Sequence, residues 1–265
     1  MIAASGGSGT IGIHLPTSVR RVSLDLSLSE FTLELGKSEE VNFIHLAGLV
    51  GISKVDKNQK LAYRINVDGT LRLAERFLKE HDGVFYFISS SHVYKASNKI
   101  LKEDSDLNPT SAYAEYKLIA EEKLKELFQD NKSRLSIIRV FSVLDWDVPD
   151  FTLGGAIKQL ADPNSKFVLQ NSEDIRDFLT PKMIAESLFE IAASGKIDGI
   201  TNLCTGVGTS VGDAATKMLK ARNLAPDLSR VQRGQSSNPY VVGDNGRLKN
   251  AMPHLNLTWD LIKTR

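Results

Sequence analysis

Two kinds of hydrophobic pattern alternate along the first half of the chain. Short runs are apolar throughout and rich in β-branched or aromatic residues, which is typical of strands buried on both faces of a sheet. Between them lie longer stretches in which apolar residues recur every three or four positions, as on one face of an α-helix. The short runs predict strands over residues 1–5, 21–24, 43–47, 84–89 and 136–141.

The longer stretches predict two helices, over residues 67–81 and 112–129. Strands that alternate with helices in this way favour a doubly wound α/β fold with a parallel sheet, because helical crossovers join parallel strands. We therefore expect such a domain over residues 1–144. The apolar positions expected to face its core are Leu71, Ala74, Phe77 and Leu78 in the first helix, and Ala120, Leu124, Leu127 and Phe128 in the second.

The pattern changes after residue 144. Prolines, glycines and polar segments separate shorter elements, which we expect to be helices near residues 155–160 and 181–194 and a strand at 201–204. No internal repeat or linker separates the two halves. Residues 145–265 are therefore expected to form a smaller lobe that is interleaved with the first domain.

Charge and composition are those of an ordinary globular protein, with 42% hydrophobic residues, 25% charged residues and a net charge of +1. The near-neutral charge gives no electrostatic attraction to nucleic acid or to an anionic membrane. No apolar run is long enough to cross a bilayer. We therefore expect a cytoplasmic enzyme that binds neither nucleic acid nor membrane.

Cysteine and histidine give no sign of metal or disulfide chemistry. The single cysteine, Cys204, excludes a disulfide within the chain, and its strand-like surroundings predict a small buried hydrophobe rather than a reactive thiol. The five histidines are scattered, and no Cys/His spacing is that of a metal site. We expect no metal.

A glycine-rich loop follows the first predicted strand. Residues 5–12 read SGGSGTIG, with glycines at positions 6, 9 and 12. Glycines at this spacing allow a tight turn from strand to helix and let the backbone approach a pyrophosphate at the helix N-terminus. Glycine also collects in loops for conformational reasons alone. Because the loop follows the first strand of a predicted α/β domain, we interpret it as part of a dinucleotide site.

The segment after the glycine loop is unusually short. A dinucleotide-binding domain has a full helix and then a second strand ending in Asp or Glu about twenty residues on. Here Pro16 ends the helix early, and Asp25 follows thirteen residues after the last glycine. Either Asp25 ends a shortened second strand and meets the adenosine ribose, or that strand is missing and Asp25 and Leu26 belong to the next one, beside the adenine. Spacing slightly favours the second alternative, and the choice between NAD and NADP stays open, because Arg20 or Arg21 could also meet a 2′-phosphate.

A serine-rich strand end and a Tyr–Lys pair suggest acid–base chemistry. The predicted strand at 84–89 runs into Ser89, Ser90 and Ser91, at the end of the sheet where ligands bind in such folds. Tyr113 and Lys117 share one helical face. An unperturbed tyrosine has a pKa near ~10 and is a poor base, so we expect the Lys117 ammonium to lower this pKa. Such a tyrosine can take a proton from a sugar hydroxyl while a hydride leaves the same carbon for nicotinamide.

Taken together, the motifs resemble the extended short-chain dehydrogenase/reductases, the NAD-dependent epimerase/dehydratase family of nucleotide-sugar enzymes. The resemblance covers nearly the whole chain. It implies a Rossmann-like NAD(P)-binding domain over residues 1–144 and a mainly substrate-binding lobe over 145–265. The matching motifs are SGGSGTIG (5–12), FIHLAG (43–48), NVDGT (66–70), ISSSHVY (88–94), YAEYK (113–117), RVFSV (139–143), IRDF (175–178) and VQRG (231–234).

The resemblance assigns roles to single residues. It makes Tyr113 the acid/base and Lys117 its partner, which also holds the nicotinamide ribose. The family's catalytic Ser or Thr lies four residues before the tyrosine of the VY motif, which selects Ser90. Asn66 matches the asparagine that supports the active-site backbone.

Two larger sets of binding residues follow from the same resemblance. Two of the substrate residues are arginines that match those holding the substrate's diphosphate, a role suited to the guanidinium group. The implied substrate-binding residues are Ser90, Ser91, Ser142, Arg176 and Arg233. The implied cofactor-binding residues are Gly6, Ser8, Gly9, Thr10, Ile11, Gly12, Asp25, Leu26, Leu46, Ala47, Gly48, Asn66, Ser89, Tyr113 and Lys117.

The chain departs from the family's pattern at two places. The 4,6-dehydratases of the family carry an Asp-Glu pair directly after the catalytic hydroxyl, where this chain has Ser91 and His92, so we do not expect dehydration. His92 is either a second acid/base or a core or loop histidine. The sequence SVLDW at 142–146 replaces the usual NVYGP, so the sugar pocket is expected to be atypical.

These observations lead to one preferred function and two alternatives. We expect an NAD(P)-dependent oxidoreductase that acts on a nucleotide-diphosphate sugar as a 4-epimerase, through a 4-keto intermediate. The alternative is an NADPH-dependent nucleotide 4-ketosugar reductase, and the third hypothesis is a non-catalytic NAD(P)-sensing regulator. The resemblance also implies a homodimer formed through the helices at 67–81 and 112–129.

Overall fold

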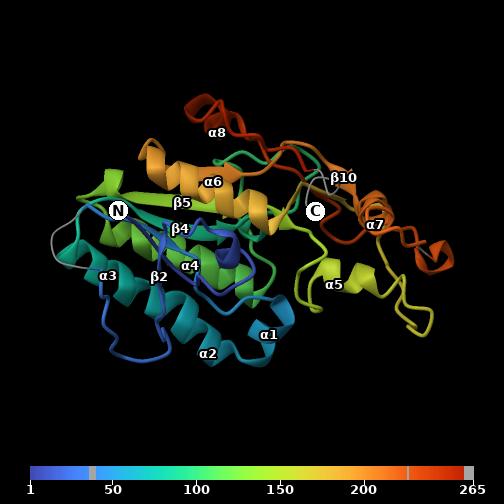
Figure 1. Cartoon of the computed structure of the whole chain (residues 1–265), viewed down its shortest axis with the longest axis horizontal. Coiled ribbons are helices and arrows are strands. Elements are labelled where there is room, and N and C mark those ends of the chain that lie inside the picture. Colours follow the sequence, from blue (N-terminus) through green and yellow to red (C-terminus); the bar gives the residue numbers. More distant parts are fainter. Residues whose placement is uncertain (36–39, 226, 260–265) are drawn as a thin grey trace.

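A six-stranded parallel sheet forms the centre of the molecule (Figure 1). The computed structural model describes residues 1–35, 40–225 and 227–259. The strand order is β2-β1-β3-β4-β5-β9, and each neighbouring pair is parallel, which confirms the expected Rossmann-like α/β fold. The strands are β1 (Ile2–Ser5), β2 (Arg20–Val22), β3 (Asn42–His45), β4 (Phe85–Ser90), β5 (Leu135–Val140) and β9 (Gly199–Leu203).

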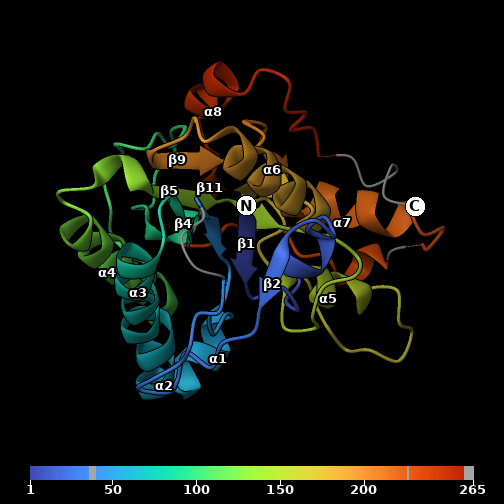
Figure 2. The same ribbon diagram turned by 60° about the vertical axis from the view of Figure 1, so that its left-hand side comes forward.

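Helices cover both faces of this sheet (Figures 1 and 2). α3 (Thr70–Glu80) and α4 (Ala112–Leu127) pack on one face, and α6 (Pro181–Ser194) packs on the other. Successive side chains of a strand point to opposite faces. Phe43 of β3 accordingly packs with α3 and α4, whereas Ile44 packs with α6. This double covering explains why every residue of β4 and β5 is buried.

The first predicted helix begins later than its pattern suggests. Residues Arg64–Gly69 form a turn of π-helix, and α3 follows from Thr70. Leu73, which the pattern did not select, is fully buried, whereas Leu71 is only partly buried. The inserted π-turn rotates the helix after it, so a single 3.6-residue period cannot describe the whole stretch. Two short helices precede this turn, α1 (Ile52–Lys57) and α2 (Gln59–Tyr63).

The start of α4 is fixed by a capping serine. The Ser111 hydroxyl accepts a hydrogen bond from the Ala114 N–H at 3.3 Å, as an N-cap residue does. The cap places Tyr113 in the first turn of α4. Lys117, Ala120 and Leu124 then lie on the buried side of the helix.

The remaining elements form a smaller lobe with its own core, packed beside the carboxyl end of the sheet. A three-stranded sheet (β10-β7-β11) and a two-stranded one (β6-β8) lie here. β9 and α6 come from the second half of the chain, but β9 belongs to the central sheet and α6 packs on it. The boundary between two domains at residue 144 stays a prediction. The elements of this lobe are β6 (Ser142–Val143), α5 (Leu153–Lys158), β7 (Ile175–Arg176), β8 (Phe178–Leu179), β10 (Thr209–Ser210), α7 (Val211–Lys220) and β11 (Tyr240–Val241). The exception is α8 (Gly246–Ala251), which packs against β9, and its Leu248 belongs to the core that α6 covers.

The segment after the glycine loop is indeed reduced. A single 3-10 turn, Gly12–His14, separates β1 from β2, and β2 pairs directly with β1, with Ser5 opposite Val22. Within the described residues between β2 and β3, there is no helix or extended strand. A strand therefore does lie beside β1, but it ends three residues before Asp25. The carboxylate of Asp25 accepts hydrogen bonds from the N–H and hydroxyl of Ser27 at 3.0 and 2.6 Å and does not end a strand.

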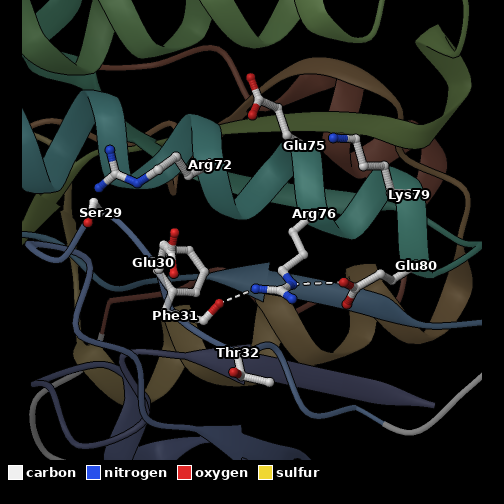
Figure 3. Close-up of a pocket in the computed structure, with 9 residues that line it drawn as sticks. All are labelled: Ser29, Glu30, Phe31, Thr32, Arg72, Glu75, Arg76, Lys79 and Glu80. Carbon is white, nitrogen blue, oxygen red and sulfur yellow. Dashed lines mark hydrogen bonds and ion pairs between the residues drawn. The ribbon is translucent and has the colours of Figure 1, made fainter.

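Arginines of α3 hold this irregular segment in place (Figure 3). Arg72 donates to the carbonyls of Leu26 and Leu28 at 3.0 and 2.9 Å, and Arg76 donates to the carbonyl of Phe31. Arg76 also pairs with Glu80 at 2.7 Å. Between α3 and residues 29–32 lies a hollow of about 600 Å³, here called the α3 trough. None of the residues that line it belongs to the Tyr–Lys pair, and both arginines already donate to backbone carbonyls.

Candidate active site

A cavity of about 570 Å³ opens where β1, β3, β4 and β5 end, against the small lobe. This is the place where the strand order reverses from β1 to β3, and ligands bind at such switch points in open α/β sheets. Ten of the residues expected from the sequence line it. They are Thr10, Ile11, Leu46, Ser89, Ser90, His92, Tyr113, Lys117, Ser142 and Arg176.

Tyr113 projects into this cavity from the first turn of α4. Burial raises the pKa of Tyr113 to about 12, and a hydrogen bond with the Ser90 hydroxyl acts in the opposite direction. The expected lowering by Lys117 was wrong for this arrangement, because desolvation dominates. At neutral pH the phenol is protonated, so it is ready to donate a proton to a substrate oxygen.

Lys117 lies behind the tyrosine, nearly buried. Its ammonium donates to the Ile88 carbonyl at 2.7 Å and lies 4.7 Å from the centre of the Phe87 ring. Burial lowers the pKa of Lys117 to about 8, and the nearby carboxylate of Glu121 opposes this shift. The side chain thus carries a positive charge below about pH 8.

Ser90 and His92 form a pair at the end of β4. The Ser90 hydroxyl lies 2.9 Å from Nδ1 of His92 and accepts a longer bond from the His92 N–H at 3.3 Å. Desolvation and the positive charge of Arg176 lower the pKa of His92, so the ring is neutral at pH 7. The rings of His92 and Tyr113 meet edge to face, with centroids 6.3 Å apart. His92 therefore lies beside the candidate acid/base and not in the core.

The two predicted substrate arginines occupy different places. Arg176 lines the cavity and forms an ion pair with the nearly buried Asp174 at 2.8 Å. Arg233 does not line it. Arg233 is exposed on the segment that runs beside Leu169, where the Leu169 N–H donates to the Arg230 carbonyl and the Gln232 N–H donates to the Leu169 carbonyl. The structure brings only Arg176 to the candidate catalytic residues.

The glycine loop is held so tightly that side chains are excluded. A Cβ on Gly6, where φ is +71°, would lie 2.6 Å from the Ala47 nitrogen. A Cβ on Gly12 would collide with the Gly6 carbonyl oxygen. Arg21 covers the outside of the loop: its side chain would meet a Cβ on Gly7 at 2.7 Å, and its guanidinium donates to the Leu15 carbonyl at 2.6 Å. The loop is thus closed on itself by backbone contacts and presents Thr10 and Ile11 to the cavity.

Several predicted cofactor residues lie outside the cavity wall. Asp25 is exposed and bonded to Ser27, and Leu26 is buried against α3. Gly48 lies against Asn66, which is buried. Ser91, a predicted substrate residue, is also buried and does not line the cavity. The others of this kind are Gly6, Ser8, Gly9, Gly12 and Ala47, which belong to the glycine loop and to the segment packed on it.

A buried ion pair supports the end of β4 from behind. Arg139 of β5 donates to both carboxylate oxygens of Glu121, at 2.7 and 3.1 Å, and both side chains are almost fully buried. Ser89 donates to the same carboxylate at 2.5 Å. Arg139 also stacks on the Tyr94 ring, with its guanidinium carbon 4.7 Å from the ring centre. The residue before Ser90 is therefore tied to α4 and β5 together.

Part of the cavity wall carried no signal that sequence reasoning used. Phe151, at its mouth, packs on Gly51 and under the Lys54 ammonium, 4.0 Å from the ring centre. Asp174 was detectable in principle, since it stands two residues before Arg176. The unselected lining residues are Val50, Gly51, Ile52, Ile88, Val140, Phe141, Val143, Val148, Pro149, Phe151, Thr152, Leu153, Leu169, Gln170, Asn171, Asp174, Phe178 and Val211.

Two further properties concern the described part of the chain as a whole. In residues 1–35, 40–225 and 227–259, no three His, Cys, Asp or Glu side chains are grouped so that they could hold a metal ion. Within the same residues, no helix combines the length and apolar character that a membrane crossing needs. Cys204 is fully buried, and burial raises the pKa of its thiol.

Comparison with solved structures shows the same fold in proteins that were solved with NAD or NADPH. MoeE5 in complex with UDP-glucose and NAD has a TM-score of 0.79 at 21% identity, covering 99% of this chain and 95% of its own. RMD from Pseudomonas aeruginosa complexed with NADPH has a TM-score of 0.81 at 20% identity, with 99% and 94% covered. UDP-glucose 4-epimerase from Thermus thermophilus, in complex with NAD, has a TM-score of 0.76 at 17% identity, with 99% and 95% covered.

The sequence itself matches a family over most of its length. The match runs over residues 14–204, which begins just after the glycine loop and includes the serine-rich strand end, the Tyr–Lys pair and the IRDF segment. It therefore covers the central sheet from β2 to β9 and most of the cavity wall. The chain belongs to the NAD dependent epimerase/dehydratase family.

Proposed function

We propose that this protein is an NAD(P)-dependent oxidoreductase of nucleotide-diphosphate sugars that works as a 4-epimerase through a 4-keto intermediate. The observation that carries the proposal is the convergence of Ser90, Tyr113, Lys117 and Arg176 on one cavity that begins at the glycine loop. A proton-transfer group, a cation and an anion-binding group thus face one space. That combination suits oxidation and reduction at a sugar hydroxyl next to a diphosphate.

The glycine loop fits a dinucleotide. Its backbone is packed so closely that a Cβ at Gly6 or Gly12 would collide with main-chain atoms, which leaves the bare loop as one border of the cavity. Thr10, Ile11 and Leu46 would lie along the cofactor, and Lys117 would hold its nicotinamide ribose. When bound, the nicotinamide dinucleotide accepts a hydride from the sugar and returns it.

The chain's own residues would move the proton and hold the substrate. For oxidation, Tyr113 must first lose its own proton, and the phenolate then accepts the proton of the reacting hydroxyl. During reduction the phenol gives that proton back, and Ser90 hydrogen-bonds the same oxygen. Lys117 supplies positive charge behind the phenol. Arg176 binds the diphosphate and so fixes where the sugar lies relative to Tyr113.

The similar solved structures support the ligand class. MoeE5 was solved with UDP-glucose and NAD, RMD with NADPH, and the Thermus thermophilus protein is a UDP-glucose 4-epimerase with NAD. By analogy we propose a nucleotide-diphosphate sugar and NAD or NADP for this chain. Asp25 bonds to Ser27, and the Arg21 guanidinium lies beside the glycine loop. Neither contact selects between NAD and NADP, so both cofactors are tested.

One observation favours a 4-ketosugar reductase as the second candidate. A phenol with its pKa raised to about 12 is a proton donor, and reduction of a ketone needs a donor. A reductase exchanges its cofactor at each turnover, whereas a 4-epimerase keeps it through the cycle. The third hypothesis, a regulator that senses NAD(P), needs none of the Ser90, Tyr113 and Lys117 set.

The decisive experiment combines cofactor retention with a substrate screen. Protein is purified without added nucleotide, denatured, and the supernatant tested for NAD and NADP. UDP-, dTDP- and GDP-sugars are then supplied, and epimer formation and NADPH consumption with 4-keto sugars are followed. Retained cofactor with epimer formation supports the epimerase, and NADPH consumption without retention supports the reductase. Binding of NAD(P) without either reaction, in wild type and Tyr113→Phe alike, would favour the regulator.

We also propose His92 as a second acid/base. Its ring is neutral at pH 7, lies 2.9 Å from the Ser90 hydroxyl and faces the Tyr113 ring, so it can relay a proton through Ser90 to the substrate oxygen. The dehydratase reaction is not proposed, because Ser91 and His92 stand where an Asp-Glu pair would be needed. In addition, Ser91 is buried and does not line the cavity.

Activity is expected to fall on the alkaline side of the pH profile. The Lys117 ammonium, with its pKa lowered to about 8, is charged below that pH and loses its charge as the pH rises through it. kcat/KM should therefore decline about tenfold per pH unit above about pH 8 if the cation is required. Steady-state profiles from pH 6 to 10 measure this. In Lys117→Arg the charge persists, so the decline should vanish from whatever activity remains; a flat wild-type profile to pH 10 would contradict the role.

The two arginines give a matched pair for substrate binding. Arg176→Ala should weaken nucleotide-sugar binding by about 1.5–3 kcal/mol, the scale of hydrogen bonds to charged groups, and leave NAD(P) binding nearly unchanged. Arg233→Ala is the comparison, because Arg233 lies outside the cavity wall, and its loss should be much smaller. Calorimetry with a UDP- or dTDP-sugar measures both. Equal losses of affinity in the two variants would indicate that Arg233 also binds the substrate. Unchanged affinity in Arg176→Ala would show that Arg176 does not bind it.

The predicted homodimer and cytoplasmic location stay proposals. Among the described residues of α3 and α4, no large hydrophobic side chain is exposed, so a dimer through these helices would use mainly polar contacts. The part of these helices that faces away from the sheet carries charged residues such as Glu75, Lys79, Glu122 and Lys123.

A further inference from the structure

A line of buried polar side chains lies beneath the cavity and is not used by the proposed chemistry. The Ser5 hydroxyl is 2.7 Å from Nδ1 of His45, and Nε2 of His45 is 2.9 Å from the Thr70 hydroxyl. Thr70 in turn donates to the Asn66 carbonyl at 2.9 Å. Each of these four side chains is at most 2% exposed. We call this line the His45 relay.

The proton positions in the relay follow from its ends. The hydroxyl hydrogen of Thr70 is used by the Asn66 carbonyl, which can only accept, so Nε2 of His45 must carry a hydrogen and donate to Thr70. In a neutral ring Nδ1 then accepts, and the Ser5 hydroxyl donates to it. The Ser5 oxygen also accepts from the Ala47 N–H at 3.4 Å. Every bond therefore points the same way, from Ala47 to Asn66.

The environment of the His45 ring allows one protonation state and one tautomer. It lies among Phe85 and Phe87, with ring centroids 5.8 and 6.1 Å away. Burial, followed by the charge of Lys117, lowers the pKa of His45 to about 3. His45 is therefore neutral at any pH at which the protein would work, and the Nε2–H tautomer is the one that satisfies both neighbours.

The relay connects two pieces of backbone that border the cavity. At one end is Ser5, the last residue of β1, whose carbonyl also accepts from Leu46 and which leads into the glycine loop. At the other end is Asn66, whose side-chain amide exchanges two hydrogen bonds with the backbone of Leu49, at 2.7 and 2.9 Å. Between these points lie residues 46–51: Leu46 and Ala47 pack directly on Gly6, and Leu46, Val50 and Gly51 line the cavity. Asn66 lies in the π-turn, an irregular piece of helix that positions its side chain toward Leu49.

We propose that His45 is a positioning residue for the cofactor: through Ser5 and through Thr70 it fixes the glycine loop and the 46–51 wall relative to each other. The proposal rests on the cofactor site of the proposed function. Because His45 touches neither the cavity nor Tyr113, it acts on cofactor affinity through the backbone of these two segments and not on the proton transfer itself.

A second buried histidine of the same core provides the matched control. His81 is also buried and also packs on a phenylalanine, but within the described residues neither of its ring nitrogens has a hydrogen-bond partner. If burial of a histidine were all that mattered, His45→Phe and His81→Phe would behave alike. The relay predicts that they differ in cofactor binding and not only in stability.

The experiment measures dissociation constants for NAD and NADP, kcat at saturating cofactor, and Tm. In His45→Phe we expect the dissociation constant of the bound cofactor to rise at least tenfold, with kcat at saturation within about threefold of wild type. His81→Phe should leave the dissociation constant within twofold. His45→Gln, whose amide carries an acceptor oxygen and a donor NH2 group, should recover part of the lost affinity.

A second pair of variants tests whether the effect runs along the relay. Thr70→Val removes the link between His45 and Asn66 and should weaken cofactor binding by itself. Both changes break the same line of hydrogen bonds. The double variant His45→Phe/Thr70→Val should therefore bind cofactor no more weakly than the single variant with the higher dissociation constant. Independent packing defects would instead multiply the two increases in dissociation constant.

Three outcomes would overturn the proposal. They are an unchanged dissociation constant in His45→Phe, an equal change in His81→Phe, and a fall in kcat and Tm without a change in affinity, which describes partial unfolding. If His45→Phe does not fold, His45→Gln and Thr70→Val carry the test, and unchanged affinity in both counts against the relay. Wild-type protein that binds neither NAD nor NADP would instead refute the proposed function.

Discussion

Tyr113→Phe should lower turnover by a factor on the order of 10² to 10⁴ while cofactor affinity stays within about twofold of wild type. The substitution removes only the phenolic hydroxyl, so the ring still fills its place against His92. The expected loss is the usual contribution of general acid–base catalysis. The measurement is kcat/KM on the substrate found in the screen, together with calorimetry for NAD and NADP.

A neighbouring tyrosine of the same helix serves as control. Tyr116 lies three residues further on, outside the cavity wall, where its ring meets Tyr63 edge to face. Tyr116→Phe should leave kcat/KM within about twofold. If Tyr113→Phe keeps near-normal activity, or if both variants lose activity equally, the phenol of Tyr113 is not the proton-transfer group.

Glu121→Leu should destabilise the fold by about 3–5 kcal/mol, the largest stability effect expected here. The change leaves the buried guanidinium of Arg139 without its carboxylate and leaves the Ser89 hydroxyl without an acceptor. Removing one member of a buried pair costs this much because the remaining charge is neither solvated nor neutralised. Urea unfolding at neutral pH measures the loss, provided that wild type and variant show the same dependence of unfolding free energy on urea concentration.

The double variant Glu121→Leu/Arg139→Met separates the lost charge from lost packing. Replacing both members with apolar side chains removes the uncompensated charge, so most of the stability should return. Glu186→Gln is the surface comparison, since Glu186 pairs with Lys182 at 3.8 Å and both side chains are more than half exposed. It should change stability by less than about 1 kcal/mol. A loss below about 1 kcal/mol in Glu121→Leu would show that the buried pair is not an energetic support of the site.

The sequence predicted the sheet and its main helices well because each is a contiguous segment with its own period. β4 and β5 are each apolar at four of their six positions, and α6 was placed with its observed bounds. The prediction failed in segments whose hydrophobic residues do not repeat at the spacing of a helix or a strand. The π-turn before α3 and the segment before α5, which brings Phe151 to the mouth of the cavity, left no repeating pattern to detect.

The candidate site was predictable to the extent that its residues lie at the ends of regular elements. Ser90, Tyr113 and Lys117 follow from a strand end and a helix face, and the structure brings them to one cavity. Arg233 and Asp25 were placed by their position in motifs, and neither reaches the cavity, because loop geometry after β2 and before β11 is set by contacts distant in sequence. The raised pKa of Tyr113 was also missed, since the extent of burial cannot be read from spacing.

The arginines of α3 fasten residues 26–31 by their carbonyl oxygens alone. A carbonyl is the same in every residue, so this fastening does not depend on which side chains the segment carries. Leu28, for example, is held by its backbone while its side chain is more than half exposed. Exposed positions such as residue 28 are therefore free to vary in sequence as long as the backbone path is kept, whereas Arg72, Arg76 and the buried Leu26 are not. The side chains that hold this N-terminal segment thus lie outside it, in α3, more than forty residues further along the chain.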